Sequence, residues 1–340
     1  MTTPDTQLPP SPLPEGWSSP EVITDVVVAD GVRLYRAGIA SKAPTGEEIT
    51  GSAAEASASP AARGFFELLE RASIIEALRE RQPRYELRTL DGSVAGDCTS
   101  GEIFPESDDP DRWRYARSNG VAIHDDWSSA AQRAWWELVE RDRVLRSWYG
   151  ETAPRRLALD LAATPLAASE TYEWCAYAFD GDAGNGDAGV HVAGVFGFPK
   201  KADLPLVLGY GARDSEAAAL DAAMREAMQL LAFLWGEPVA SEVPPLGPTA
   251  MHHLERFQFA GHHELLRRWL SGAHRDFGRD RATAPAPARA DVRFIDLTPA
   301  WLKGRMFVAK AHCPAAMPLA FGDCPHASHL PVELRPHPIA

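Results

Sequence analysis

Apolar and polar positions along the chain follow two periods, which predict a mixture of strands and helices. Residues 22–41 are rich in β-branched side chains with partial alternation, and this indicates strands. Apolar residues repeat with the helical period in three segments, over residues 63–81, 128–149 and 215–235. A shorter helix is expected over residues 262–270. The remaining apolar runs predict strands over residues 173–179, 190–198, 292–297 and 306–312.

The segments between these elements are polar or rich in proline and glycine. Residues 1–20 are polar and Pro-rich, so we expect a disordered arm there. Residues 43–59 are small and polar and predict a loop or lid. We expect a hairpin loop over residues 180–189, a Pro/Ala linker over 283–290 and an irregular tail from Pro314.

Composition and charge exclude several classes of protein. The 340 residues carry 34 Lys and Arg against 47 Asp and Glu, a net charge of −13. An acidic chain lacks the basic footprint that binds nucleic acid or an anionic membrane, so neither partner is expected. No apolar run approaches the roughly 18 residues of a transmembrane helix, and the first residues do not form a signal peptide. The 4 cysteines imply no disulfide framework. A cytoplasmic location is therefore expected.

Three predicted helices share one residue pattern in one phase. Residues 60–71 read PAARGFFELLER, residues 130–141 read AAQRAWWELVER and residues 219–229 read ALDAAMREAMQ. In each, a small residue lies three positions before a glutamate, and a second carboxylate or carboxamide lies three positions after it. The resulting pairs are Glu67 and Glu70, Glu137 and Glu140, and Glu226 and Gln229. Internal similarity of this kind indicates a common physical role.

Side chains three positions apart lie on one face of a helix, and here they interrupt otherwise apolar segments. Two ionised carboxylates in a partly buried site repel each other and are poorly solvated unless a cation compensates them. Mg²⁺ is the natural cation, because it binds oxygen ligands and often shares them with phosphate groups. The alternative is three surface helices with solvated Glu and Arg side chains. Repetition of the pattern in three helices favours the metal site.

These residues, taken in order with several others, resemble the YcaO family of ATP-dependent enzymes that modify peptide backbones. The resemblance covers roughly residues 35–340. Besides the three helices it rests on Gly51-Ser52, on residues 118–122 (SNGVA), 209–212 (GYGA), 294–298 (FIDLT) and 336–338 (PHP). His124 stands where family members usually have glycine, and Leu231 where arginine is frequent.

The resemblance implies a nucleotide site without a Walker loop, and no G-x-x-x-x-G-K-[ST] motif occurs in the chain. It assigns Mg²⁺ binding to Glu67, Glu70, Glu137, Glu140 and Glu226. It places three further residues beside ATP, namely Asn119, Arg141 and Gln229. Mg²⁺ held by carboxylates provides the positioning and charge neutralisation that phosphoryl transfer needs.

The implied fold is α+β, a single large YcaO-like domain over residues 21–340, in which a mixed, largely antiparallel sheet packs against the three motif helices. The implied activity is that of a cyclodehydratase forming azolines in a ribosomally made peptide, the chemistry behind thiazole- and oxazole-modified peptides (RiPP biosynthesis). ATP activates a backbone amide by O-phosphorylation after a Cys, Ser or Thr side chain attacks it. Two alternatives stay open. One is thioamide formation with a partner protein, and the other is a non-catalytic scaffold that binds a precursor or a partner.

The expected partners are a precursor peptide and a separate peptide-recognition protein, because the residues before 35 are too few to fold as such a domain. A homodimer is left open. The two prolines in Pro336-His337-Pro338 stiffen the chain end. We therefore expect the tail to serve the site, with His337 and the Ala340 carboxylate as candidates for proton transfer.

Other chemistry-bearing groups give weaker signals. Cys and His side chains that suit zinc are gathered near the end of the chain, at His312, Cys313, Cys324, His326 and His329. They contain no C-x-x-C pair, so ordinary packing is the favoured interpretation. The pairs His252-His253 and His262-His263 lack the H-E-x-x-H arrangement and are expected at the surface or at an interface.

Overall fold

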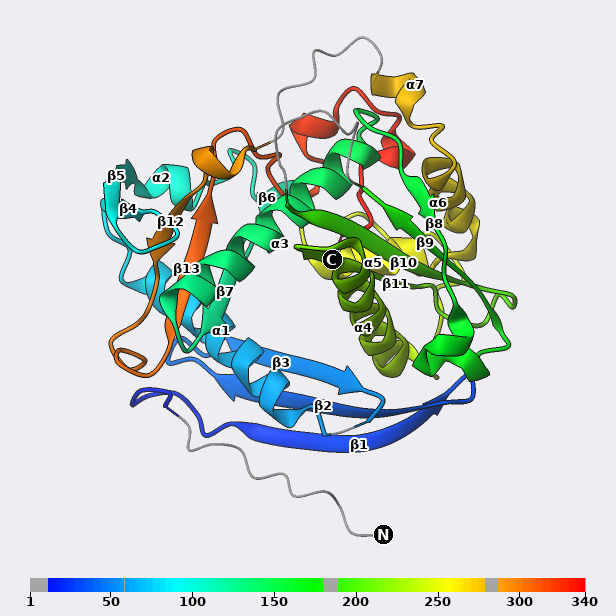
Figure 1. Ribbon diagram of the computed structural model, residues 1–340, viewed down its shortest axis with the longest axis horizontal. Coiled ribbons are helices and arrows are strands. Elements are labelled where there is room, and N and C mark those ends of the chain that lie inside the picture. The colour runs from blue at the N-terminus through cyan, green and yellow to red at the C-terminus, as the bar shows by residue number, and fades with distance from the viewer. Residues whose placement is uncertain (1–11, 58, 180–188, 279–286, 340) are drawn as a thin grey trace.

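The fold is α+β, as the sequence predicts (Figure 1). The structure is a computed structural model that describes residues 12–57, 59–179, 189–278 and 287–339. Within these ranges the strands form four sheets, and each strand pairing is antiparallel. The three motif helices are α1 (Ala61–Arg79), α3 (Trp127–Trp148) and α4 (Glu216–Leu234), and each packs on sheet strands.

The first sheet is a meander of β1 (Glu21–Ala29), β2 (Val32–Lys42) and β3 (Glu48–Glu55). The sequence predicts the first two strands correctly. The prediction of a loop or lid over residues 43–59 is wrong, because β3 occupies the middle of that segment. Its small residues carry little hydrophobic signal, yet Ala53 and Ala54 are 1% and 0% exposed. They are small because α1 lies directly on the strand.

Contact between α1 and β3 depends on two glycines. A Cβ atom on Gly51 of β3 would lie 1.9 Å from the Gly64 carbonyl oxygen and 2.5 Å from the Leu68 backbone nitrogen, both on α1. No side chain can be accommodated at that distance. The helix backbone therefore lies against the strand backbone at the level of the first glutamate of the motif.

The second sheet has the order β11 (Val207–Arg213), β10 (His191–Pro199), β9 (Tyr172–Ala178), β8 (Arg155–Leu157). Helix α4 packs on β11 and β10 in the same close manner. A Cβ atom on Gly209 would lie 2.4 Å from the Ala223 carbonyl oxygen, and one on Gly211 would lie 2.5 Å from that of Ala219. Glycine is thus required on β3 beneath α1 and on β11 beneath α4.

The third sheet has the order β5 (Val94–Thr99), β4 (Arg84–Arg88), β12 (Arg293–Asp296), β13 (Phe307–His312), β7 (Val121–His124). Helix α3 packs against β13 and β7. A two-stranded sheet pairs β14 (Ala320–Gly322) with β6 (Trp113–Tyr115). Segments from both halves of the chain therefore meet beneath α3.

Short helices complete the described part of the chain. They are α2 (Ser100–Ile103), α5 (Ala250–Gln258), α6 (His263–Leu270) and α7 (Arg275–Gly278), with 3-10 turns η1 (Leu161–Ala163), η2 (Pro165–Ala168), η3 (Ala260–His262), η4 (Arg289–Asp291), η5 (Pro325–Ala327) and η6 (Val332–Leu334). Among the helices described, none has the length and apolar character needed to cross a bilayer. Residues 180–188 of the predicted loop and residues 283–286 of the predicted linker over 283–290 lie outside the described residues, and η4 begins at Arg289 within the linker.

The described part of the N-terminal arm contacts the fold. Trp17 Nε1 donates a hydrogen bond to Glu76 Oε1 at 3.1 Å, and the Ser18 N–H donates to the Lys42 carbonyl at 3.0 Å. The prediction of a disordered arm over residues 1–20 is therefore wrong for residues 12–20, where an indole ring covers apolar surface on α1 and β1. Residues 1–11 lie outside the described residues.

The chain end is buried. His337 and Ile339 are 0% and 1% exposed, and the Tyr210 hydroxyl donates to the Pro338 carbonyl at 3.3 Å. His253, expected at the surface or at an interface, is also 0% exposed, because its ring packs 4.5 Å from that of His337 and its Nε2 accepts the Gly322 N–H. The expectation of a surface or interface position is therefore wrong for His253, which lies inside the fold. Ala340 lies outside the described residues.

Candidate functional site

The three motif helices meet around one cavity of about 1030 Å³. Strands β3, β7 and β11 supply the rest of its wall, and Figure 1 shows α1, α3 and α4 converging on this region. Every residue of the three motif pairs lines the cavity, together with Arg141. The structure therefore brings together the five glutamates and two of the three nucleotide-binding candidates singled out from the sequence. The third, Asn119, does not line the cavity wall.

The first glutamate of each motif accepts a backbone N–H, in two motifs from the strand beneath the helix and in the third from the residue that precedes β7. Glu67 Oε2 accepts from Ser52 at 2.8 Å, and Glu226 Oε2 accepts from Tyr210 at 2.7 Å. The corresponding contact of Glu137 Oε1 with the Gly120 N–H is longer, at 3.4 Å. Two of these donors directly follow the glycines that allow close helix packing. The shared sequence pattern thus corresponds to a shared contact.

The second residue of each motif faces the centre of the cavity. Gln229 reaches across to β3, where its Nε2 donates to the Ser52 carbonyl at 3.2 Å. Burial, together with the nearby Glu137 and Glu67 carboxylates, raises the pKa of Glu70 well above its ordinary value. Glu140 is 7% exposed, and its Oε1 lies 3.5 Å from Arg141 Nε. These carboxylates keep oxygen atoms available for a cation.

Carboxylates around the cavity resist ionisation in the absence of a cation. Burial raises the pKa of Glu137 to about 6 and that of Glu140 to about 8, and it also raises the pKa of Glu226. Arg141 offsets part of this: although burial disfavours its charge, the neighbouring carboxylates, led by Glu140, raise its pKa above the ordinary value. The described residues that line the cavity include seven carboxylates and five arginines, so ionisation of all of them leaves an excess of two negative charges. A divalent cation is therefore the expected complement.

We expect the stability of the metal-free protein to fall as pH rises from about 6.5 to about 8.5. A carboxyl whose folded pKa is raised contributes stability at low pH and loses it as pH passes through the folded value, here about 8 for Glu140. Buried His253 and His337 have lowered pKa values and act with the opposite sign, but below about pH 6.5. Melting temperatures measured across this range, with and without Mg²⁺ and AMPPCP, check the prediction.

The added Mg²⁺ and nucleotide should raise the melting temperature more at about pH 8.5 than at about pH 6.5. A metal-free protein that is most stable near the upper limit, or an equal effect of Mg²⁺ at both pH values, contradicts the assignment of these carboxyls to a cation site.

A buried lysine that sequence reasoning missed shapes the loop beside Glu137. Lys310 Nζ donates to the Asn119 carbonyl at 2.6 Å and to that of Arg117 at 3.2 Å. Burial lowers the pKa of Lys310 to about 8, while Glu137 favours its charged form. Asn119 Oδ1 is buried without a hydrogen-bond partner among the described residues. The one available signal was a lysine within the apolar run of residues 307–311.

Arginines around the cavity are a second feature that sequence reasoning left out. They come from all three motif helices and from β11, and they are Arg63, Arg133, Arg213 and Arg225. Arg63 pairs with Glu55 at 2.9 Å, and the Arg213 guanidinium lies over the Trp136 ring, 5.1 Å from its centroid. Guanidinium groups bind phosphate oxygens with two parallel hydrogen bonds. The cavity therefore combines cation ligands with phosphate-binding groups.

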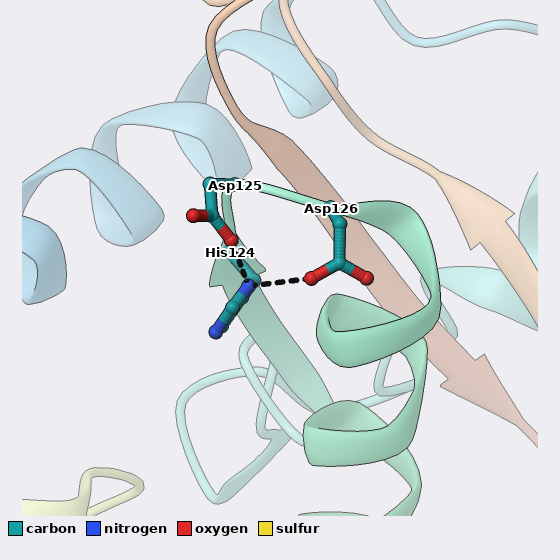
Figure 2. Close-up of side chains that lie close together, drawn as sticks. All are labelled: His124, Asp125 and Asp126. Atoms are coloured by element: carbon teal, nitrogen blue, oxygen red, sulfur yellow. Dashed lines mark ion pairs between the residues drawn. The ribbon is translucent and has the colours of Figure 1, made fainter.

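A separate acidic group lies at the mouth of the cavity. Figure 2 shows His124 at the end of β7, its Nδ1 2.5 Å from Asp125 Oδ1 and 3.0 Å from Asp126 Oδ2. Within the part of the chain that the structure describes, these three residues form the one compact His/Cys/Asp/Glu group of metal-binding geometry. Asp126 also caps α3 by accepting the Ser129 N–H at 2.8 Å. Both carboxylates are largely solvated, so this group needs no cation.

Two groups singled out from the sequence are not among the described residues that line the cavity. The Cys and His residues near the chain end do not come together in metal-binding geometry in the described structure, which leaves ordinary packing. His337 does not line the cavity, and its Nε2 lies 2.9 Å from the Ala320 carbonyl. Burial lowers the pKa of His337 to about 4. Its observed contacts fix the tail beneath Tyr210 and the cavity wall.

Comparisons with known proteins agree with this geometry. A family model described as YcaO cyclodehydratase, ATP- and Mg²⁺-binding, matches residues 98–314. A YcaO protein from Methanopyrus kandleri, solved with AMPPCP and Mg²⁺, superposes with a TM-score of 0.59 at 16% identity over 87% of this chain and 85% of that chain. The E. coli microcin synthetase McbBCD complex gives 0.57 at 12% identity over 86% and 87%.

A heterocyclase in complex with substrate and cofactor gives a TM-score of 0.51 at 16% identity, over 89% of this chain and 50% of that chain. At these identities the structural likeness shows the fold alone. Comparison with curated proteins gives no significant match.

The donors present suit the nucleotide and metal that the family model names. The five motif glutamates, among carboxylates that outnumber the arginines, and a set of guanidinium groups meet in a space large enough for a nucleotide. The family model covers more than half of the 340 residues, and the chain therefore belongs to the YcaO family, as an ATP-dependent cyclodehydratase with ATP and Mg²⁺ as its cofactors.

Proposed function

We propose that this enzyme activates a backbone amide by O-phosphorylation and so forms azolines from Cys, Ser or Thr residues of a ribosomally made precursor peptide. One observation carries the proposal: five glutamates from three separate helices line a single cavity that arginines also line. Membership in the cyclodehydratase family supports the same reaction class. The retained carboxylates argue against a non-catalytic scaffold, since that role gives no reason to bury them.

The proposed ligands of Mg²⁺ are Glu67, Glu70, Glu137, Glu140 and Glu226. When bound, the metal would supply positive charge that orients the phosphates and stabilises charge developing at the transferred phosphoryl group. A backbone N–H group holds one oxygen of Glu67 and one of Glu226, and the other oxygen of Glu67 accepts from Arg71 Nη2 at 2.6 Å. Arg141, Gln229 and Asn119 are proposed to contact the nucleotide.

The proposed reaction has three steps. The substrate thiol or hydroxyl loses its proton and attacks the preceding carbonyl carbon, forming an S–C or O–C bond and an oxyanion. The oxyanion attacks the γ-phosphorus of ATP, a P–O bond forms, and ADP leaves. Loss of the amide proton then breaks the C–O bond, releases phosphate and leaves a C=N bond. The cavity arginines would stabilise the charged phosphate groups throughout.

The proposed partners are the precursor peptide and a separate peptide-recognition protein. The McbBCD complex has also been solved with pro-MccB17 bound, an assembly that shows a chain of this fold beside a peptide and other proteins. We further propose that residues 21–340 act as one ATP-binding domain and that residues 1–20 stay outside it apart from the contacts of residues 12–20. A homodimer remains a proposal.

An isotope experiment tests the reaction. A candidate precursor, a short Cys/Ser/Thr-rich peptide sought among the flanking genes, is synthesised with ¹⁸O in its backbone carbonyls and incubated with the enzyme, Mg²⁺, ATP and any recognition protein encoded with it. We expect one labelled phosphate for each molecule of water lost from the peptide. A peptide that instead exchanges oxygen for sulfur identifies thioamide formation, and ATP turnover without labelled phosphate contradicts amide O-phosphorylation.

A further inference from the structure

A second, smaller cavity lies on a different face of α3. Consecutive side chains of this helix line the two cavities, Trp136 the large one and Trp135 the small one. The small cavity has a volume of about 290 Å³. Its other walls come from the turn after β4, at Thr89 and Leu90, and from the segment around Arg289 and Phe294. It shares no lining residue with the nucleotide cavity.

The indole of Trp135 is the first sign that this cavity accepts a ligand. The side chain is 4% exposed, and its Nε1 is buried with no hydrogen-bond partner among the described residues. Two fully buried tryptophans differ from it: Trp148 Nε1 donates to the Leu334 carbonyl at 2.8 Å, and Trp269 Nε1 donates to Ser147 Oγ at 3.0 Å. Because an unpaired buried donor is unfavourable, an acceptor in the cavity would be stabilised there.

Positive charge is the second sign. The Arg289 guanidinium lies over the Trp135 ring, 5.1 Å from its centroid, and Arg293 lines the cavity beside it. No Asp or Glu side chain is among the described residues that line this cavity. Leu90, Val292 and Phe294 make the remaining wall apolar. A guanidinium and an indole N–H beside an apolar wall match a carboxylate attached to an apolar group.

We propose that this cavity binds the α-carboxylate of a bulky apolar amino acid, free or at the C-terminus of a peptide. The carboxylate would accept from Trp135 Nε1 and pair with Arg289, while the side chain packs against Leu90 and Phe294. The volume of about 290 Å³ suits one amino-acid residue and is far below that of the nucleotide cavity. The proposal stands independently of the peptide chemistry proposed above.

The test is titration calorimetry with N-acetyl-L-phenylalaninate, using N-acetyl-L-phenylalaninamide as the uncharged control. Mg²⁺ and AMPPCP are present throughout, so that arginines of the nucleotide cavity are occupied. We expect the carboxylate to bind at least about fivefold more tightly than the amide. Arg289→Gln and Trp135→Phe should each weaken carboxylate binding about fivefold or more. Arg268→Gln, at an exposed arginine of α6 that lines neither cavity, should leave it unchanged.

Unchanged AMPPCP affinity and unchanged circular dichroism show that the variants are folded. Equal binding of carboxylate and amide overturns the proposal, as does an equal effect of Arg268→Gln and Arg289→Gln, or no binding of the carboxylate by the wild type. Two further titrations distinguish a free amino acid from a peptide C-terminus as the ligand. Free phenylalanine and the peptide Gly-Gly-Phe carry the same carboxylate, and the tighter of the two identifies a metabolite or a peptide end as the ligand.

Discussion

Replacing Glu137 and Glu140 together by glutamine is expected to weaken Mg²⁺-dependent binding of AMPPCP by about a hundredfold or more. Both side chains line the cavity from α3, and burial raises their pKa values to about 6 and about 8. Glutamine keeps the size and one acceptor oxygen of each side chain but removes the negative charge that Mg²⁺ requires. Titration calorimetry with AMPPCP in the presence and absence of Mg²⁺ measures the loss.

The same substitutions should stabilise the ligand-free protein near pH 8, since they remove buried charges that repel each other. A higher melting temperature combined with lost binding separates a missing metal ligand from misfolding. The matched control is Asp221→Asn with Glu264→Gln, two exposed acids outside the cavity whose replacement changes the net charge equally. Wild-type affinity in the Glu137/Glu140 double variant would refute the assignment of the metal site.

Replacing Gly51 by alanine is expected to destabilise the fold by at least about 3 kcal/mol. The added Cβ would lie 1.9 Å from the Gly64 carbonyl oxygen and 2.5 Å from the Leu68 nitrogen, so the backbone of α1 has to move away from β3. Ser52 follows Gly51 and donates to Glu67, so this movement also displaces the first glutamate of the α1 motif. Urea denaturation measures the stability, and AMPPCP titration measures the effect on the site.

The neighbouring strand offers a matched control. Gly38 of β2 is paired with Ser52, and a Cβ atom there would meet nothing within 4 Å. Gly38→Ala should therefore leave AMPPCP affinity unchanged. It should raise the free energy of unfolding by about 0.4 kcal/mol or more, because alanine reduces the conformational entropy of the unfolded chain. Similar stabilities for the two alanine variants would show that α1 and β3 adjust freely and that close packing does not position Glu67.

The contacts of the motif residues explain why so much of the site was predictable. A helix can lie close enough for its glutamate to reach the strand backbone only if a small residue precedes the glutamate by one turn and a glycine lies opposite on the strand. Both residues can be recognised in the sequence. Gly51 and Gly209 both meet a helix backbone, and the residue after each donates to a motif glutamate. This arrangement occurs beneath α1 and α4, and repetition of the helix pattern in three segments made that local pattern specific.

Features that depend on contacts distant in sequence were not predictable. The strand β3 was missed because several of its residues are small, as close packing against α1 requires. Small residues give no strand signal of their own. Lys310 was missed because its partners, the carbonyls of Arg117 and Asn119, lie far away in the chain. The buried position of His253 depends on His337, which comes from the chain end.

The residue pattern by itself determined the mixture of helices and strands, the three motif helices and the five glutamates that line one cavity, whereas the α+β class and the nucleotide-binding candidates were implied by the family resemblance. The properties that the residue pattern determined depend on helical period and on charge placed within apolar segments, which are local in the chain. The tertiary structure alone decided how the strands divide into four sheets, which arginines surround the site and where the C-terminal tail lies. The division into sheets, the positions of the arginines and the course of the tail depend on which segments, distant in sequence, pack together. That packing is a property of the whole fold, and no local pattern encodes it.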